Sequence, residues 1–439
     1  MDHSSVLNKY PTYRDSLIKG YWLYLEGRRM DDNAEGYWRV HDKLYDLEGF
    51  ELTHPGGHEW ISMTKGTDIT ELFESHHISP IAPKLLEKYF KKDADAPRNY
   101  NLTYDENGFY KTLKRRVMAA LPTLDTSVIW ISKATSDAVL CGFFIASILA
   151  ARAEDFYTKL LLIALAAKFG AWIIPTSHNF NHQRNNWRRF NANFVMLGWR
   201  TWRTTHVISH HMYSNSFTDM EITVLEPFVQ LLPVHGRSKL EMTLNYLLLP
   251  VSYFFPFHGG FIFRYLGIFY AKNYKLHWDE ILVFLPPIFM FLLGSSSYSL
   301  SNLLDTLILW NIIIAFASFL FVAVAVSGGH HSPTIVHEGD DIKSMDFGIY
   351  QMLTTFDRKE AALNLPIAVL YFGDHVLHHL FPTLDQAVLP QLKDILEKTC
   401  KEFDVKYFKY GAVKSFFGLL KQISKTKGSK IRDVNINQK

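Results

Sequence analysis

The chain has 439 residues, and its 46 Lys and Arg against 43 Asp and Glu leave a formal charge of +3, which gives no sign of a nucleic-acid-binding surface. Its apolar residues are concentrated, and the uncharged runs 281–304 and 306–329 each exceed the roughly 18 to 20 residues that cross a bilayer. These runs exclude a soluble protein, and a content of only two cysteines excludes a disulfide framework.

The first part of the chain contains a turn suited to a flat ligand. Residues 1–20 form a tail without the unbroken apolar core of a secretion signal, which predicts a cytosolic N-terminus. Residues 36–47 have the aromatic and branched side chains of half-buried strands. In the sequence His54-Pro-Gly-Gly that follows, Pro fixes the backbone and the two glycines allow the chain to pass close to a ligand.

Over residues 21–95 the chain resembles the cytochrome b5 family, through Tyr45-Asp46-Leu47, the His54-Pro-Gly-Gly turn, Asp68 and Phe73. The resemblance implies a small α+β domain that binds haem b between two His side chains. It makes His54 the first axial ligand and His77 the second, with His76 as the alternative because the doublet leaves the alignment open by one residue. A haem with two protein ligands transfers electrons and does not bind oxygen.

Residues 96–126 begin with a polar stretch that predicts a linker. Beyond it the apolar runs predict an all-α membrane domain at 127–425, with about four transmembrane helices at 130–151, 157–176, 281–304 and 306–329. Asp137 and Lys168 lie deep in the first two runs, where a charge is functional, shielded by the bundle, or a sign of a misplaced span. The basic tail at 426–439 favours the cytosolic face.

Histidine is unusually clustered in this domain. Four His-His doublets occur in the chain, where random placement of 20 His in 439 residues predicts about one. Three clusters have helical spacing, so that each presents its imidazoles on one face, with His211 turned about 100° from His210 toward a second metal or a neighbouring ligand. These three boxes are His178-x3-His182, His206-x3-His210-His211 and His375-x2-His378-His379.

Eight imidazoles are too many for one zinc ion, which takes four ligands, and they suit two iron ions with positions left open for oxygen. His330, His331 or His337 could supply a ninth ligand, and we favour His331. If all three boxes face one metal centre, an even number of membrane crossings separates the second box from the third. The apolar run from Thr243 to Phe263 therefore does not cross, which agrees with its interrupting Pro and Gly residues.

The order and spacing of the boxes, with a transmembrane pair between the last two, resemble the membrane fatty acid desaturases that carry an N-terminal b5 domain. The resemblance implies an enzyme of the endoplasmic reticulum whose haem domain and boxes face the cytosol. It implies electrons from an NAD(P)H-dependent cytochrome b5 reductase, passed through haem to two non-haem irons that use O2 to desaturate a fatty acyl lipid or acyl-CoA. His375 starts the third box, where front-end desaturases of this kind usually have Gln.

Two other functions fit the same residues. The scaffold could hydroxylate an acyl or sphingoid chain, because the activated iron can return a hydroxyl group instead of removing a second hydrogen. The chain could also be a non-enzymatic electron carrier anchored in the membrane. An anchor needs one helix and no metal ligands, so the eight His residues favour an enzyme.

Overall fold

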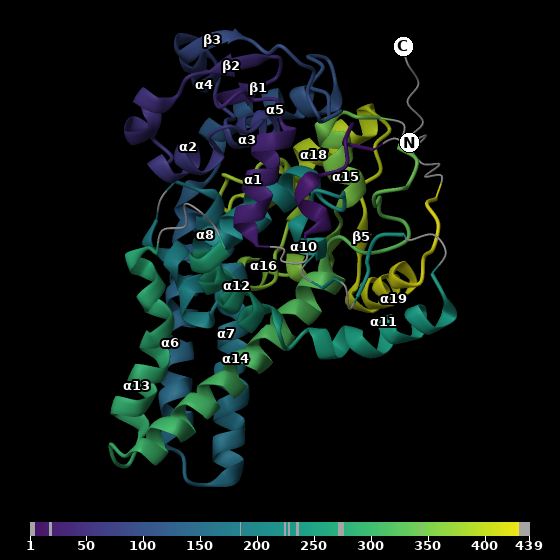
Figure 1. Ribbon diagram of the computed structural model, residues 1–439. Helices are drawn as coiled ribbons and strands as arrows, with labels where there is room; N and C mark the ends of the chain where they lie inside the picture. The colour runs from purple at the N-terminus through teal and green to yellow at the C-terminus, as the bar shows by residue number, and fades with distance from the viewer. Residues whose placement is uncertain are drawn as a thin grey trace.

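A computed structural model gives the fold as an upper body and a narrower lower lobe of helices (Figure 1). It describes residues 5–16, 20–184, 186–223, 225–226, 229–233, 237–270, 276–342 and 344–429. Residues 430–439, which include most of the predicted basic tail, lie outside the described residues.

The N-terminal domain is a small α+β unit, which confirms the sequence prediction. Strands β1 (Trp38–Val40), β2 (Lys43–Tyr45) and β3 (Phe90–Asp93) form an antiparallel sheet in that order, and the first two lie in the segment predicted as strands. The helices of this domain are α1 (Tyr21–Asp31), α2 (His58–Thr64), α3 (Thr70–His76) and α4 (Ile81–Leu86).

Residues 96–126 differ from a free linker, because they contain α5 (Phe109–Ala120). Its buried residues Phe109, Leu113 and Val117 recur every four positions, so the helix has one apolar face. The hydroxyl of Tyr110 donates to the carbonyl of Glu74 in the haem domain at 3.0 Å and lies 3.4 Å from that of Leu380. We missed this apolar spacing in the sequence because the stretch before Phe109 is polar. Helix α5 contacts both the haem domain and the membrane domain, and so it links the two parts of the chain.

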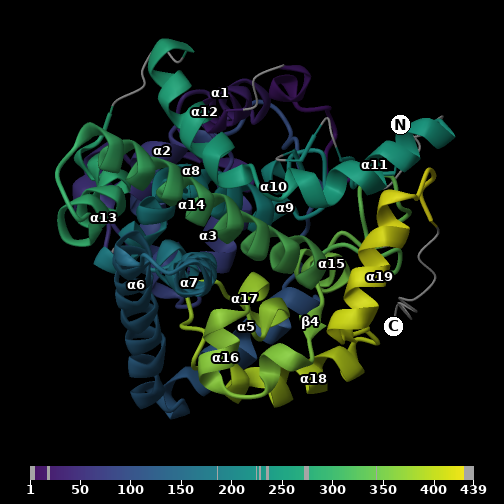
Figure 2. The same ribbon diagram turned by 90° about the horizontal axis from the view of Figure 1, so that it is seen from below.

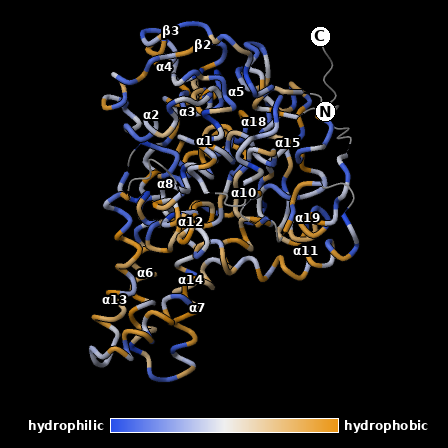
Figure 3. Tube along the Cα trace, in the orientation of Figure 1, coloured by the Kyte–Doolittle hydropathy of each residue, from blue (hydrophilic) through white to orange (hydrophobic). Residues whose placement is uncertain are grey.

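The lower lobe consists of α6 (Ile129–Arg152), α7 (Phe156–His182), α13 (Leu285–Gly294) and α14 (Leu300–Gly328), and most of its residues are hydrophobic (Figure 3). Helices α6, α7 and α14 are each long and apolar enough to cross a membrane. Helix α13 continues a 3-10 helix, Trp278–Phe284. At about 2.0 Å and 1.5 Å of rise per residue, the two pieces together extend about 29 Å, close to the roughly 30 Å of the hydrocarbon core.

The predicted end of the third span, 281–304, was wrong. The helix stops at Gly294, which packs against Ala151 near the far end of α6, and α14 already begins at Leu300. The intervening Ser295-Ser-Ser-Tyr-Ser299 is uncharged but polar, and the Ser299 side chain caps α14 by accepting from the backbone N–H of Asn302. The uncharged run 281–304 is therefore not one continuous helix.

The two deep charges of the lobe are shielded by neighbouring side chains. Arg188 pairs with Asp137 at 2.6 Å, and the Lys168 ammonium lies 4.7 Å from the ring centre of Trp172 and 5.3 Å from that of Tyr371. A charge with such partners is tolerated at membrane depth. Of the three explanations that the sequence left open, shielding by the bundle accounts for both residues.

The run from Thr243 to Phe263 is not one straight helix. It is divided between α11 (Lys239–Ser252) and α12 (Pro256–Tyr270), which are bent by 83° relative to each other. Helix α11 lies beside α19 (Ala412–Ile423) along the lower face of the upper body, and the Tyr246 hydroxyl donates to the carbonyl of Leu420 at 2.9 Å (Figures 1 and 2). Both helices expose apolar side chains there, among them Leu240, Leu247, Val413, Phe416 and Phe417.

Because this helix pair is bent and lies along the body, we expect accessibility tags inserted after Lys239 and after Leu276, both exposed, to report the same side of the membrane. A tag after Glu154, in the turn between α6 and α7, is expected on the opposite side. Cysteine labelling of intact microsomes measures all three positions. Opposite sides for positions 239 and 276 would contradict the predicted topology.

The remaining α-helices and strands, with one π-helical segment, surround the inner end of the lobe. They are α8 (Trp199–Trp202), a π-helical segment (Arg203–His210), α9 (His211–Tyr213), α10 (Met220–Thr223), α15 (Phe347–Thr354), α16 (Leu365–Leu370), α17 (His375–Leu380), α18 (Lys393–Glu402) and the parallel strand pair β4 (Asp357–Arg358) and β5 (Lys409–Tyr410).

Candidate metal centre and haem pocket

The first histidine box lies at the inner end of α7. His178 and His182 are one turn apart, as their spacing predicts, and their Nε2 atoms are 3.0 Å from each other. The third box lies on α17, and its His378 Nε2 is 3.2 Å from the Nε2 of His178. Residues about 200 positions apart in the chain are thereby joined at one site.

The second box departs from the α-helical prediction. Residues Arg203–His210 form a π-helix, whose bonds run from residue i to i+5. His206 and His211 therefore face each other, with Nε2 atoms 3.0 Å apart, while the ring of His210 stacks 5.3 Å from that of His206. The π-helix allows two adjacent His residues to serve different neighbours, and no feature of the sequence indicated it.

All eight predicted His residues come together, in adjoining groups. In the first, His178, His182, His211 and His378 are buried, and their ligand atoms lie within 4.8 Å of one another. In the second, His210, His330 and His379 meet the same criterion. A third group that meets it comprises His206, His210 and Glu221, and the Nε2 of His206 lies 2.6 Å from that of His178. His375 lies beside the second group, with its Nε2 3.4 Å from that of His330.

His331, the residue that we favoured as ninth ligand, does not join these groups, whereas His330 does. The rings of these neighbours point apart, with centres separated by 6.4 Å. His330 Nε2 lies 3.1 Å from His210 Nε2, whereas His331 Nδ1 lies 3.1 Å from the Nε2 of His337. His331 and His337 thus form a separate buried pair.

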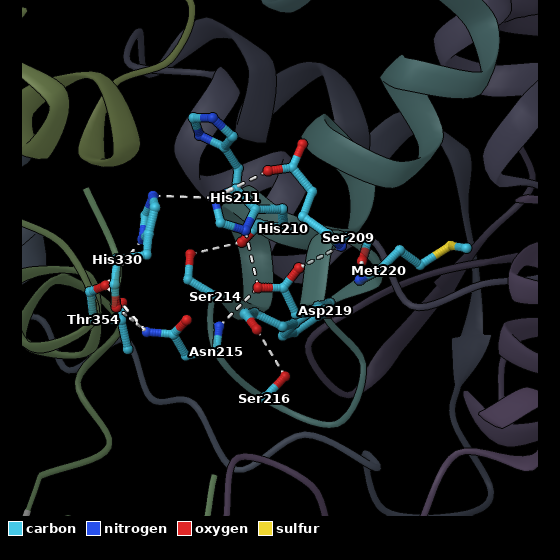
Figure 4. Close-up of polar contacts among 12 residues, drawn as sticks. Ser209, His210, His211, Ser214, Asn215, Ser216, Asp219, Met220, His330 and Thr354 are labelled. Atoms are coloured by element: carbon cyan, nitrogen blue, oxygen red, sulfur yellow. Dashed lines mark hydrogen bonds and ion pairs between the residues drawn. The ribbon is translucent and has the colours of Figure 1, made fainter. Parts of the chain in front are cut away.

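Several imidazoles are oriented by a partner at Nδ1, as Figure 4 shows for His210 and His330. Such a bond keeps the proton on Nδ1 and leaves Nε2 free to bind a metal. The partners are Glu221 for His206 at 2.6 Å, Asp219 for His210 at 2.9 Å, the Thr354 carbonyl for His330 at 2.9 Å and Gln351 for His379 at 3.1 Å. Sequence reasoning missed these partners, although Asp219 and Glu221 closely follow the second box.

Asp219 also connects the second box to His330. Its Oδ2 accepts the backbone N–H of Asn215, and the Asn215 amide donates to the carbonyls of His330 and Val336 at 3.0 and 2.9 Å (Figure 4). Asn215 has a φ of 61°, a left-handed conformation that Asn tolerates better than most residues. One buried carboxylate thus fixes the positions of His210 and His330 together.

The residues fit bound metal ions. Two imidazole nitrogens at about 2.0 to 2.1 Å from one ion lie about 2.9 to 3.4 Å apart for bond angles of 90° to 109°, and most of the Nε2 separations are in this range. Burial lowers the pKa of His211, His378 and His379 well below the ordinary value, which favours the neutral form that ligates metal. The Nε2 atom of His379 is buried without a hydrogen-bond partner among the described residues, a cost that a metal removes.

In the haem domain, two further imidazoles face each other. The ring centres of His54 and His77 are 6.2 Å apart, and an iron held at about 2.0 Å from each nitrogen would place them at about this separation. Each Nδ1 lies 3.0 Å from a backbone carbonyl, that of Gly57 or Phe73, which leaves Nε2 available. Burial lowers the pKa of His77 to about 4, so its ring is neutral at physiological pH.

The haem domain docks on the histidine boxes. The Tyr213 hydroxyl, two residues after the second box, donates to Glu71 at 2.8 Å, and the Arg203 guanidinium lies 4.1 Å from the ring centre of Trp60. Arg189 pairs with Glu59 at 3.1 Å. These buried contacts fix the haem pocket beside the metal groups.

The chain combines a b5-like haem domain with a helical membrane domain that carries three histidine boxes, and comparison with known proteins identifies its family. Residues 156–411 match the family described as Fatty acid desaturase, and residues 26–95 match the Cytochrome b5-like Heme/Steroid binding domain. The chain belongs to the fatty acid desaturase family and carries an N-terminal cytochrome b5 domain. It is an integral membrane protein of a family whose domains imply haem and iron.

The similarity to individual relatives covers most of the chain. A Drosophila melanogaster protein named Cytochrome b5-related protein is 39% identical over 404 residues, covering 91% of this chain and 90% of that protein. The Probable Delta(5) fatty acid desaturase C of Dictyostelium discoideum is 24% identical, covering 89% and 92%. The Acyl-lipid (8-3)-desaturase of Physcomitrium patens is 26% identical, covering 94% and 93%. No solved structure matches the chain significantly.

Proposed function

We propose that this protein is an O2-dependent fatty acyl desaturase that holds two non-haem iron ions in its histidine groups and haem b between His54 and His77. The first iron site comprises His178, His182, His211 and His378, and the second His210, His330, His375 and His379, with His206 between them. When bound, the two irons activate O2 for removal of hydrogen from an unactivated C–H bond.

The observation that carries this proposal is a pocket lined both by a membrane helix and by the candidate metal ligands. Its walls combine apolar side chains from the inner end of α14 with imidazoles of both later boxes. The cavity has a volume of about 40 Å³, enough for a methylene group beside the ligands. The rest of an acyl chain would lie outside it, along α14, which faces the bilayer. The lining residues include Phe321, Val324, Ala325, Phe372, His206, His210, His330 and His375. An electron carrier needs no such pocket.

The atoms and electrons of the desaturation balance if the b5 domain supplies two electrons. Two adjacent CH2 groups lose two hydrogens to form a C=C bond, and O2 with two electrons and two protons takes them up as two molecules of water. The electrons would come from an NAD(P)H-dependent cytochrome b5 reductase, by way of a haem held by His54 and His77. The apolar side chains of the pocket position the methylene groups and exclude bulk water. The buried carboxylate of Asp219 and the half-buried carboxylate of Glu221 hold the ligands in place.

The proposed orientation places the haem domain and all three boxes on the cytosolic side of the endoplasmic reticulum membrane. The exposed apolar faces of α11 and α19, which lie crosswise to the lobe, would rest at the interface of the bilayer. With these two helices at the interface, the haem domain would lie outside the bilayer, where a cytosolic reductase can reach it. The substrate would be a fatty acyl chain of a membrane lipid or an acyl-CoA.

Lipid product analysis tests the proposal. Expression in yeast cells that lack their own desaturase and are kept alive by supplied unsaturated fatty acid is expected to yield a new cis-unsaturated acyl chain. The matched control is the His378→Ala variant, which removes a ligand of the first group. A hydroxylated chain would favour the hydroxylase alternative, and an unchanged lipid profile from protein with full haem and iron content would contradict both enzymes.

A further inference from the structure

His76 lies between the haem pocket and the metal groups and has no role in either. It is the last residue of α3, and its ring lies 6.1 Å from that of His182, with the two planes inclined by only 25°. The ring of its neighbour His77 points instead toward His54. The two adjacent imidazoles thus face opposite sites.

Ser75 and Trp60 of the haem domain also contact the ring of His76. Its Nδ1 lies 2.9 Å from the hydroxyl of Ser75, but its Nε2 is buried without a hydrogen-bond partner among the described residues. One face of the ring lies near Trp60, with ring centres 5.3 Å apart.

His76 is also not placed as a metal ligand. The group that contains His182 comprises His178, His211 and His378, and no ligand atom of His76 belongs to it. Nearly parallel rings at 6.1 Å are in contact range for aromatic side chains. The contact therefore connects the outside of the first metal group to the haem domain.

We propose that His76 is the bridge through which electrons pass from the haem to the non-haem iron, a role that rests on the proposed function. Electron tunnelling weakens steeply with the width of a gap and less steeply through bonded atoms. The path runs from the His77 ligand through one peptide to His76, and then across a single ring contact to His182. One ferrous haem is oxidised and one ferric ion of the first group is reduced in each transfer, and the imidazole itself is not oxidised.

The test uses the full-length protein, loaded with haem and iron, reconstituted in lipid nanodiscs and kept free of oxygen. A light flash reduces the haem through a soluble photosensitiser, and the Soret band then reports its reoxidation by the non-haem iron. For the wild type we expect internal reoxidation. For His76→Ala we expect the rate to fall by at least an order of magnitude, with an unchanged low-spin haem spectrum, haem potential and iron content.

Two further variants separate the bridge from a role in docking. His76→Phe keeps an aromatic ring where Nε2 has no partner, so we expect a rate close to that of the wild type. Tyr24→Phe removes a contact between the same two domains, the hydroxyl bond to the Ile208 carbonyl at 3.3 Å, and is expected to leave the rate unchanged. Thermal unfolding of each variant reports the docking contribution separately.

The outcomes distinguish this inference from the proposed function. A wild-type rate in His76→Ala with intact haem and iron would overturn the bridge alone, and so would a His76→Phe variant as slow as His76→Ala. Loss of the low-spin spectrum in His76→Ala would overturn it as well, because His76 would then be the haem ligand. A wild-type haem that stays reduced in protein with both iron ions bound would contradict the proposed function and the bridge with it.

Discussion

We expect the His330→Ala variant to lose non-haem iron and lipid oxidation while it keeps the haem spectrum. His330 is buried, its Nε2 faces those of His210 and His375 at 3.1 and 3.4 Å, and its Nδ1 is held by the Thr354 carbonyl. Loss of an outer-shell partner of a metal ligand costs about 10- to 100-fold in affinity or activity, and loss of the ligand itself should cost at least the upper part of this range. Metal analysis of purified protein and lipid product analysis measure the two effects.

The neighbouring residue supplies the control. His331→Ala removes an equally buried imidazole, but one that pairs with His337 outside both metal groups. We expect it to keep wild-type iron content and product yield, even if its stability falls. Equal iron loss in the two variants would contradict the assignment of His330 as the ninth ligand.

The second large effect concerns the haem. Replacing His77 with Ala is expected to abolish the low-spin haem spectrum, because His54 would remain as a single protein ligand on one side of the iron. The non-haem iron is expected to stay, since neither His54 nor His77 belongs to the two metal groups. Absorption spectra and iron analysis of the same preparation separate the two sites.

His58→Ala is the control for this experiment. His58 lies in the same domain, just after the His54-Pro-Gly-Gly turn, but its side chain is exposed and 3.4 Å from Glu59. We expect its spectrum to match the wild type. An unchanged low-spin spectrum in His77→Ala would transfer the second axial position to His76 and remove the basis of the electron bridge.

The sequence by itself determined the domain order, the lengths of the apolar runs and the histidine boxes. Each depends on local spacing: His178 and His182 share a face of any helix that contains both, and an uncharged run as long as 306–329 must cross or lie in a membrane. The His54-Pro-Gly-Gly turn is equally local, because Gly57 adopts a φ of 114° that other residues rarely adopt.

Only the tertiary structure decided which histidine of each doublet points to which site. In His330-His331 and His76-His77 the two residues have the same chemistry, and their ring directions depend on packing against distant segments such as Thr354 and His182. The bonds from the Asn215 side-chain amide to the carbonyls of His330 and Val336 arise in the same way, from contacts between distant segments. Local spacing contains no information on these contacts, because they join residues far apart in the chain.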